Sequence, residues 1–233
     1  MKIRSFVIAY ALVLAILLFA DRRPGSTQQD RYSHVVDLTV AQEAAVMSSS
    51  TTQTRIIAPA ALIPGTWAAG QIPAERLIAP LVVMDLNPDQ NSNSSTSAQI
   101  SLDDISAWES RHGIIPQGAV LAIRRGLKTN AASSASPAQF PVEHDAAEFL
   151  IDARNTIGFA VETRVDLASD RDLARQLALH GNYVVEATAR FTALPATGSL
   201  IIVAPSIALP SRVVSPKDKK PGEVPARILA MVR

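Results

Sequence analysis

The chain has 233 residues, of which 48% are hydrophobic and 18% are charged, and its formal net charge is +1. This composition is typical of a globular protein, and the near-zero charge argues against a nucleic-acid partner or binding to an anionic membrane surface. There is no cysteine, which excludes disulfides, zinc–thiolate sites and a cysteine nucleophile. The four histidines, His34, His112, His144 and His180, are too far apart in the sequence for a local His-x3-His metal site.

The N-terminus has the pattern of an export signal. Lys2 and Arg4 precede an uninterrupted hydrophobic run over residues 6–20. This run of 15 residues is short for a membrane-spanning helix, which needs about 20 residues, so residues 1–20 are either a cleaved signal peptide or a retained signal anchor. In both cases the N-terminal positive charges predict that the body lies on the exported side of a bacterial inner membrane, the periplasm. Residues 21–33 are polar and are predicted to be a linker.

The rest of the chain alternates strand-type and helix-type patterns. Short apolar or β-branched runs predict strands, and amphipathic stretches with capping residues predict helices. In chain order the predicted elements are strand 34–40, strand 77–86, helix 101–113, strand 119–126, helix 140–153, strand 157–163, helix 169–181, strand 183–187, strand 199–209 and strand 226–233. This alternation predicts a single α/β domain over residues 34–233, with a mixed β-sheet flanked by helices and preceded by the N-terminal hydrophobic helix.

Two of the predicted helices have clear end signals. Ser101 is expected to be an N-cap, Asp104 to complete a capping box with it, and Gly113 to end that helix. Pro141 is expected in the first turn of the next helix. The side chains expected on the buried face of the first of these helices are Leu102, Ile105 and Trp108. The polar tracts 45–54, 87–99 and 127–139 are predicted to be loops.

Five stretches of the body follow one known pattern in order and spacing. They are IPAERLIAPLVVMDL, ISLDDISAWESRHG with IPQGAVLAIRRG, FPVEHDAAEFL, HGNYVVEATARFTALPATGSLIIVAPSIAL and GEVPARILAMV. Together they resemble the cyclase family of metal-dependent hydrolases, which includes bacterial kynurenine formamidase. The resemblance covers about residues 34–233. It implies the kynurenine formamidase-like α/β fold, metal-dependent hydrolysis of an amide, and a dimer.

The resemblance also implies a metal site whose ligands are mostly absent here. The family signature reads His-x-Gly-Thr-His-x-Asp-x-Pro-x-His, and a His and a Glu twelve residues apart follow later. The stretch from residue 51 to residue 61 occupies the signature slot, and Thr54 and Pro59 match it. The positions of the family's ligands hold Thr51, Arg55, Ile57, Ala61, Ala174 and Glu186, of which only Glu186 keeps the family's residue.

These replacements predict that the site holds no metal and has no catalytic residue. Ile57 and Ala61 offer no donor atom, and the permanent charge of Arg55 would repel a dication. Without a metal there is no activated water to attack an amide or ester. Arg55 either pairs with Glu186, so that one cation replaces another, or simply reaches solvent. Trp67, just after the slot, is either a ligand-stacking or interface residue or a partly buried packing residue.

The sequence predicts a function in binding or assembly. We expect an exported or membrane-tethered cyclase-like pseudoenzyme that serves as an accessory or scaffold subunit of a membrane-associated complex. Its expected partner is another protein or a second copy of itself, with membrane contact through residues 6–20, no cofactor and no nucleic acid. Two alternatives stay open: an active amide or ester hydrolase of arylformamidase type with a rearranged site, and a small-molecule binder that uses the former pocket.

Overall fold

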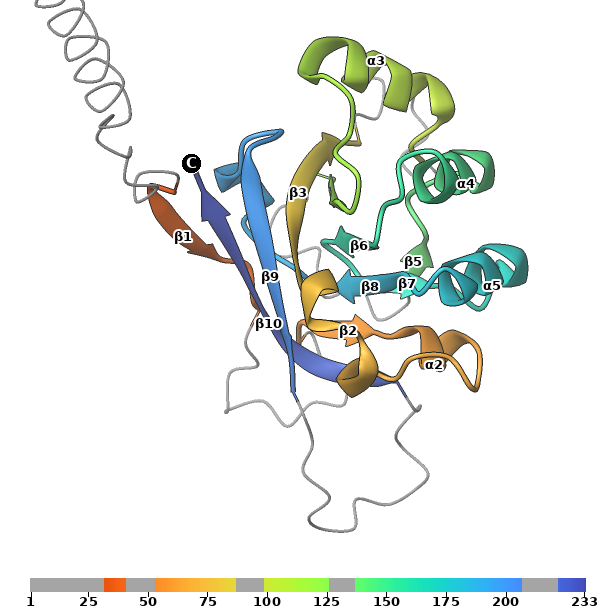
Figure 1. Ribbon diagram of the computed structural model, residues 1–233. Coiled ribbons are helices and arrows are strands. Elements are labelled where there is room, and N and C mark those ends of the chain that lie inside the picture. The colour runs from red at the N-terminus through yellow and green to blue at the C-terminus, as the bar shows by residue number, and fades with distance from the viewer. Residues whose placement is uncertain (1–31, 41–52, 87–98, 126–136, 207–221) are drawn as a thin grey trace, which may run out of the picture. The chain divides into compact units, whose positions relative to one another are not determined.

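The computed structural model describes residues 32–40, 53–86, 99–125, 137–206 and 222–233 (Figure 1). The chain divides into two compact units, residues 1–33 and residues 34–233. The predicted N-terminal hydrophobic helix and nearly all of the linker lie outside the described residues. None of the helices in the described ranges is long and apolar enough to cross a membrane.

Residues 34–233 form an α/β fold around one mixed sheet. Its strands are β1 His34–Asp37, β2 Arg55–Ile57, β3 Ile78–Asp85, β4 Val120–Arg124, β6 Gly158–Val161, β8 Tyr183–Glu186, β9 Ser199–Pro205 and β10 Glu223–Val232. Their order is β1–β10–β2–β8–β6–β4–β3–β9, and β10 also pairs with β9, so the sheet curls into a barrel-like form. The pairings β3–β4, β4–β6 and β6–β8 are parallel, and the other pairings are antiparallel.

Helices cover part of this sheet. The α-helices are α2 Pro59–Leu62, α3 Leu102–His112, α4 His144–Asp152 and α5 Arg171–Leu179. Helices α3, α4 and α5 lie side by side on one side of the sheet, and α2 contacts α5 (Figure 1). Short 3-10 helices are η2 Ala69–Gln71, η3 Ala74–Arg76 and η5 Phe191–Ala193. Strands β5 Ala138–Gln139 and β7 Val165–Asp166 form a separate two-stranded sheet.

Two hydrophobic clusters pack on opposite faces of the curled sheet. The inner cluster takes side chains from β2, β3, β4, β6, β8, β9 and β10, and includes Ile56, Leu81, Tyr183, Val185 and Phe191. The outer cluster joins the other face of β2, β3, β4, β6 and β8 to α3, α4 and α5, and includes Ile57, Trp108, Leu150, Phe159, Leu177 and Val184. Strands β1, β9 and β10 contribute no residue to the outer cluster. The helix layer therefore covers only part of the outside of the sheet.

The structure confirms the α/β fold with a mixed sheet and most of the predicted elements. In α3 the Ser101 hydroxyl accepts from the Asp104 N–H at 3.2 Å, and the Asp104 carboxylate accepts from the Ser101 N–H at 2.9 Å. This is the predicted capping box, which satisfies backbone donors that the helix leaves free. Gly113 follows the helix with a φ of +88°, a conformation that favours glycine.

Several details of the prediction were wrong. Leu102 is exposed, because residues three apart drift by about 60° around a helix, which places it at the edge of the buried stripe. The second helix begins only at His144, since Val142 forms a β-bridge with Ile100 and leaves Pro141 outside the helix. Strands β2, β5 and β7 and helix α2 were not predicted. Elements of two to four residues are too short to show a periodic pattern.

Candidate functional site

The register of two strands brings predicted site residues together. Strand β2 pairs antiparallel with β8, so that Arg55 lies directly opposite Glu186 and Ile57 directly opposite Val184. Ile57 and Val184 belong to the outer cluster. Because side chains alternate between the two faces of a strand, Arg55 and Glu186 also point to this helix-bearing face. The structure therefore groups Arg55, Ile57 and Glu186 on one side of the sheet.

A guanidinium–carboxylate pair lies at this position. The Arg55 Nε donates to the Glu186 Oε2 at 2.7 Å. The Arg55 Nη1 lies 2.9 Å from the Glu223 Oε2 of β10, the strand that pairs with the other edge of β2. The Arg55 side chain is 24% exposed and the Glu186 side chain is 0% exposed. Of the two alternatives for Arg55, the structure supports the pairing with Glu186 over simple contact with solvent, since its guanidinium bridges two carboxylates.

Glu186 is enclosed and depends on its partners. Besides the contact with Arg55, its carboxylate accepts from the backbone N–H of Val165 at 2.7 Å. Burial raises the pKa of the Glu186 carboxyl, whereas the charge of Arg55, the N–H of Val165 and the charge of Arg164 oppose that rise. An ionised carboxylate without such partners would be costly in a buried position. Arg55 thus supplies the cation that a retained Glu186 requires.

The remaining mapped positions carry no polar side chain in the described part of the structure. Ile57 is buried in the outer cluster, and Ala61 of α2 packs against that cluster while partly buried. Ala174 lies on α5, the helix that contacts α2, and is also partly buried. Thr51 lies outside the described residues. The described positions therefore sit on β2, α2, α5 and β8, elements that pack against one another.

The two residues that match the family signature have structural roles. Thr54 is fully buried, and its hydroxyl donates to the Ala187 carbonyl at 2.6 Å and accepts from the Val40 N–H at 2.7 Å. Pro59 is the first residue of α2 and is buried. Proline suits this position because its ring presets a helical φ and the first helical N–H needs no partner inside the helix. Thr54 therefore anchors the chain just before β2, and Pro59 begins α2 just after it.

The side chains present do not fit a metal ion of the kind that the fold family implies. Within the described ranges, no three His, Asp or Glu side chains lie together in a way that could hold a metal. Ile57, Ala61 and Ala174 have no donor atoms. The Arg55 guanidinium is always protonated and already bonds the one retained carboxylate. We therefore derive no chemical step through a metal at this site.

Trp67 packs against the end of α5. A Cβ added to Gly181 would lie 2.7 Å from the Trp67 ring, so the ring lies directly against the glycine. The Arg76 guanidinium lies 5.5 Å from the ring centroid, and its Nη2 donates to the carbonyls of His180 and Gly181 at 3.3 and 3.2 Å. These contacts support the packing role among the two alternatives for Trp67. Its role toward a ligand or a partner stays a prediction.

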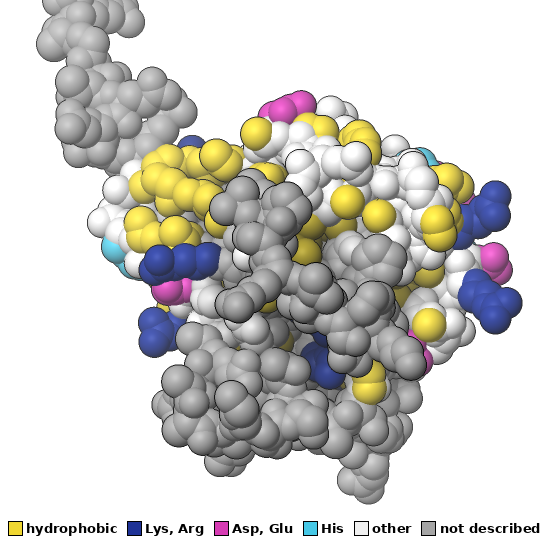
Figure 2. Space-filling view, turned by 90° about the horizontal axis from the view of Figure 1, so that it is seen from below, with side chains coloured by type: hydrophobic (Ala, Val, Ile, Leu, Met, Phe, Trp, Pro, Cys, Tyr) yellow, Lys and Arg dark blue, Asp and Glu magenta, His cyan; other side chains and the backbone are white. Residues whose placement is uncertain are grey.

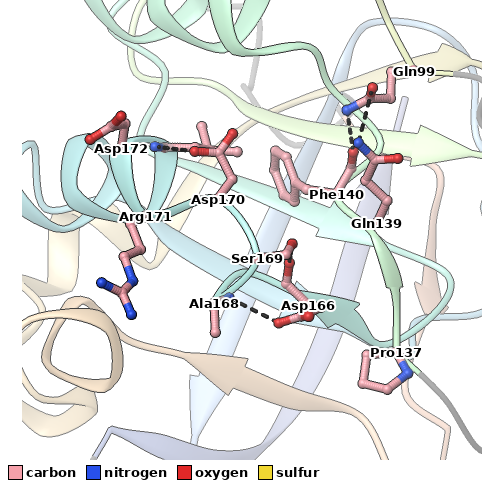
Figure 3. A pocket seen from close by; sticks show the side chains of 11 residues that line it. Gln99, Pro137, Gln139, Phe140, Asp166, Ala168, Ser169, Asp170, Arg171 and Asp172 are labelled. Carbon is pink, nitrogen blue, oxygen red and sulfur yellow. Dashed lines mark hydrogen bonds between the residues drawn. The ribbon is translucent and has the colours of Figure 1, made fainter.

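A hollow of about 750 Å³ lies beside the start of α5 (Figure 3). The residues that line it are Gln99, Pro137, Gln139, Phe140, Asp166, Ala168, Ser169, Asp170, Arg171, Asp172 and Leu173. Two of its three aspartates bond to the backbone, since Asp166 accepts from the Ala168 N–H at 3.0 Å and Asp170 caps α5 through the Leu173 N–H at 2.9 Å. These local roles account for two of the three aspartates, and none of the mapped positions within the described residues lines this hollow.

Sequence analysis did not identify two charged residues that act on the Arg55–Glu186 pair. Glu223 faces Arg55 only because β10 pairs with β2, and Arg164 acts on Glu186 across the turn between β6 and β7. No local pattern marks either residue, because each belongs to the site through long-range strand pairing or a turn. The only signal available from the sequence was that a buried Glu186 carboxylate needs a nearby cation, and this signal pointed to Arg55 alone.

Comparison with known proteins agrees with the residues that suggested the family. The family model Cyclase ("Putative cyclase") matches residues 17–165, well over half of the chain. A comparison with curated proteins found no match. Isatin hydrolase A from Ralstonia solanacearum is similar in structure, with a TM-score of 0.65 and 22% identity over 96% of this chain and 97% of that chain.

Two further structures show the same fold. Isatin hydrolase A from Labrenzia aggregata, bound to benzyl benzoate, has a TM-score of 0.61 and 22% identity over 85% of this chain and 93% of that chain. A "potential metal-dependent hydrolase with cyclase activity" has a TM-score of 0.58 and 20% identity over 86% of this chain and 98% of that chain. The structural likeness supports the fold, and the family model supplies the membership. The chain belongs to the cyclase family.

Proposed function

We propose that this chain is a cyclase-family pseudoenzyme, which keeps the fold of a metal-dependent hydrolase and works by binding or assembly. The observation that carries the proposal is the Arg55–Glu186 pair, with 2.7 Å between Nε and Oε2. In this chain the one acidic residue retained from the family pattern is bonded to a permanent cation. A positive charge thus takes the place where the family pattern implies a metal ion.

Charge balance explains how the fold tolerates the loss of the ligands. Glu186 is fully buried, and a buried carboxylate without a counter-charge is strongly destabilising. Arg55 offers this counter-charge from the neighbouring strand, and Glu223 takes up a second N–H of the same guanidinium. At the other mapped positions, Ile57 contributes to the outer cluster and Ala61 packs against it. The former site has become part of the packed interior and its ion-pair network.

The proposed location of the protein rests on its N-terminal sequence. The hydrophobic run over residues 6–20 and the positive charges before it support an exported or membrane-tethered chain, with the body in the periplasm. A protein of this kind would serve as an accessory or scaffold subunit of a membrane-associated complex. The partner would be a protein, since the near-neutral charge gives no attraction to nucleic acid.

The test is a metal and activity measurement on the purified full chain. After dialysis we expect less than one zinc, manganese or iron ion per chain by elemental analysis. We also expect no hydrolysis of an aryl formamide or of isatin above the buffer rate, with or without added zinc or manganese. The matched control is Glu186→Gln, which removes the retained carboxylate. One tightly bound ion per chain, or hydrolysis that Glu186→Gln abolishes, would establish an active hydrolase and overturn the proposal.

A further inference from the structure

Strand β8 gains one extra residue at its carboxyl end. Where β8 begins, the Tyr183 N–H donates to the Ile157 carbonyl beside β6, at 3.4 Å. Because parallel strands advance in step, a regular ladder that contains this bond would continue to an Ala187 N–H that donates to the Val161 carbonyl. In the structure the Thr188 N–H donates to that carbonyl instead, at 3.1 Å. The extra residue makes this a β-bulge, a feature that bends a strand and re-aims its side chains.

The backbone of this bulge is strained at Ala187. This residue is buried and has a φ of +53°, in the left-handed region. Residues with a Cβ rarely adopt this region, because the Cβ comes too close to the following carbonyl oxygen. Alanine also lacks the polar side chain with which asparagine or aspartate can bond locally in this conformation. Contacts from the surrounding structure must therefore hold Ala187 in place.

Thr54 supplies a side-chain bond to the strained residue. Its hydroxyl donates to the Ala187 carbonyl at 2.6 Å and accepts from the Val40 N–H at 2.7 Å. Thr54 is itself fixed, since its side chain is fully buried and its backbone bonds to Val40 and to Ala226 of β10. Thr188 anchors the far side of the bulge, because its hydroxyl also donates to β6, at 2.8 Å. The carbonyl of Ala187 is thus held from outside its own strand.

The residue directly before the bulge is Glu186. Its carboxylate meets two partners on different segments, the Arg55 Nε of β2 at 2.7 Å and the Val165 N–H of β7 at 2.7 Å. The charged side chains visible in Figure 2 lie at the surface, where water can solvate them, whereas the Glu186 carboxylate is fully enclosed. A small turn of Glu186 would therefore cost it both partners without giving it water in exchange.

We propose that Thr54 is a positioning residue, whose hydroxyl holds the bulge at Ala187 and thereby aims the Glu186 carboxylate at its partners. The chain keeps Thr54 and Glu186 from the family pattern, and the bulge connects the two. The inference goes beyond the proposed function, because the bulge would aim Glu186 in the same way in an active or an inactive member of the family.

The first experiment measures amide hydrogen exchange of the full chain by NMR. The Val165 amide reports on the aim of Glu186, to which it donates, and the Ala147 amide of α4 reports on the stability of the fold. Thr54→Val keeps the shape of the side chain and removes the hydroxyl. We expect Val165 to exchange about tenfold faster relative to Ala147, the equivalent of one lost hydrogen bond.

The matched control is Thr54→Ser, which keeps the hydroxyl and should leave the ratio of the two exchange rates near that of the wild type. Equal acceleration at Val165 and Ala147 in Thr54→Val would mean that Thr54 only stabilises the fold, and would overturn the proposal. Elemental analysis, which tests the proposed function, is independent of this readout.

The second experiment replaces the clamp by a residue that needs none. Glycine adopts the left-handed region without a Cβ clash, so adding Ala187→Gly to Thr54→Val should keep the bulge and return the exchange ratio to within about twofold of the wild type. Arg190→Gly is the matched control, because Arg190 also has a positive φ, +62°, but is exposed. Added to Thr54→Val, it should not restore the ratio.

The same comparison decides the case in which Thr54→Val alone does not fold. The double variant with Ala187→Gly should then fold, and the one with Arg190→Gly should not. Failure of Ala187→Gly to rescue Thr54→Val, or equal rescue by the two glycine substitutions, would overturn the proposal.

Discussion

Replacing Arg55 by alanine is the most informative perturbation of the ion-pair network. The variant loses the 2.7 Å bond from Arg55 Nε to Glu186 and the 2.9 Å contact from Nη1 to Glu223. Glu223 keeps some access to solvent and can be hydrated, whereas Glu186 is fully enclosed. Among the described residues, its carboxylate then keeps the N–H of Val165 and the charge of Arg164. The cost of the substitution is therefore concentrated on Glu186.

The size of this cost follows from the burial of the two partners. Breaking a fully buried pair costs about 3–5 kcal/mol, and breaking an exposed pair costs less than about 1 kcal/mol. Because Glu186 is fully buried and Arg55 is 24% exposed, we expect a loss of about 2–4 kcal/mol in the free energy of unfolding at neutral pH. A loss of this size is a large part of the stability of an ordinary domain.

The loss should depend on pH in a defined direction. Burial already raises the pKa of Glu186 in the folded chain, and removing Arg55 raises that pKa further. Consider pH values that lie between the pKa of Glu186 in the folded wild type and its higher pKa in the folded variant. In this window the folded variant binds a proton at Glu186 that its unfolded state has released. Stability of the variant therefore falls as pH rises through this window, by up to about 1.4 kcal/mol per pH unit. Its deficit relative to the wild type grows with pH and levels off above the variant's pKa.

The assay is a double-mutant cycle on the full chain, with unfolding followed at several pH values. Arg55→Ala, Glu186→Gln and the double variant are compared with the wild type. The double variant should recover much of the loss, because the orphaned charge is removed with its partner. It should also lose the extra pH dependence of Arg55→Ala. Additive effects near zero, or a deficit that does not change with pH, would refute the idea that Arg55 took over the electrostatic role of a metal.

Three further predictions concern other parts of the molecule. Arg154→Ala should destabilise the chain less than Arg55→Ala, because Glu109, the partner of Arg154, keeps some solvent access. Arg154 lowers the pKa of Glu109, so the stability that this ion pair gives the wild type should be lost as pH falls below about 4.5. Acid unfolding should show this loss in the wild type and not in the variant. Both Gly181 and Gly113 have positive φ, but only Gly181→Ala would place a Cβ against Trp67, at 2.7 Å, so Gly181→Ala should lower the melting temperature more than Gly113→Ala. In a Trp67→Ala background the two glycine substitutions should lower the melting temperature equally. A reporter fused to the C-terminus and active only outside the cytoplasm should be active, and activity of a cytoplasm-only reporter would contradict export.

Local rules accounted for the elements with strong local signals. The capping box of Ser101 and Asp104 and the glycine at position 113 fixed the ends of α3, and the apolar run before Leu86 gave β3 nearly to the residue. The same rules placed Leu102 inward and started α4 too early. The exposure of Leu102 follows from the helical repeat, which places it at the edge of the buried stripe, whereas the late start of α4 depends on a bridge from Val142 to the distant Ile100. Only the second error comes from a contact that a local window does not contain.

The sequence by itself determined that Ile57, Ala61 and Ala174 bring no side-chain donor atom to the positions mapped from the family signature, whatever the fold. Only the tertiary structure decided that the charge of Arg55 meets Glu186, since these residues are 131 positions apart and come together through the register of β2 with β8. It also decided which apolar side chains stay outside the core. Both faces of β9 and β10 are rich in apolar residues, so alternation alone does not say which face is buried. The curl of the sheet decides which face is buried, because it turns one face of β9 and β10 into the inner cluster, while the helices pack against other strands.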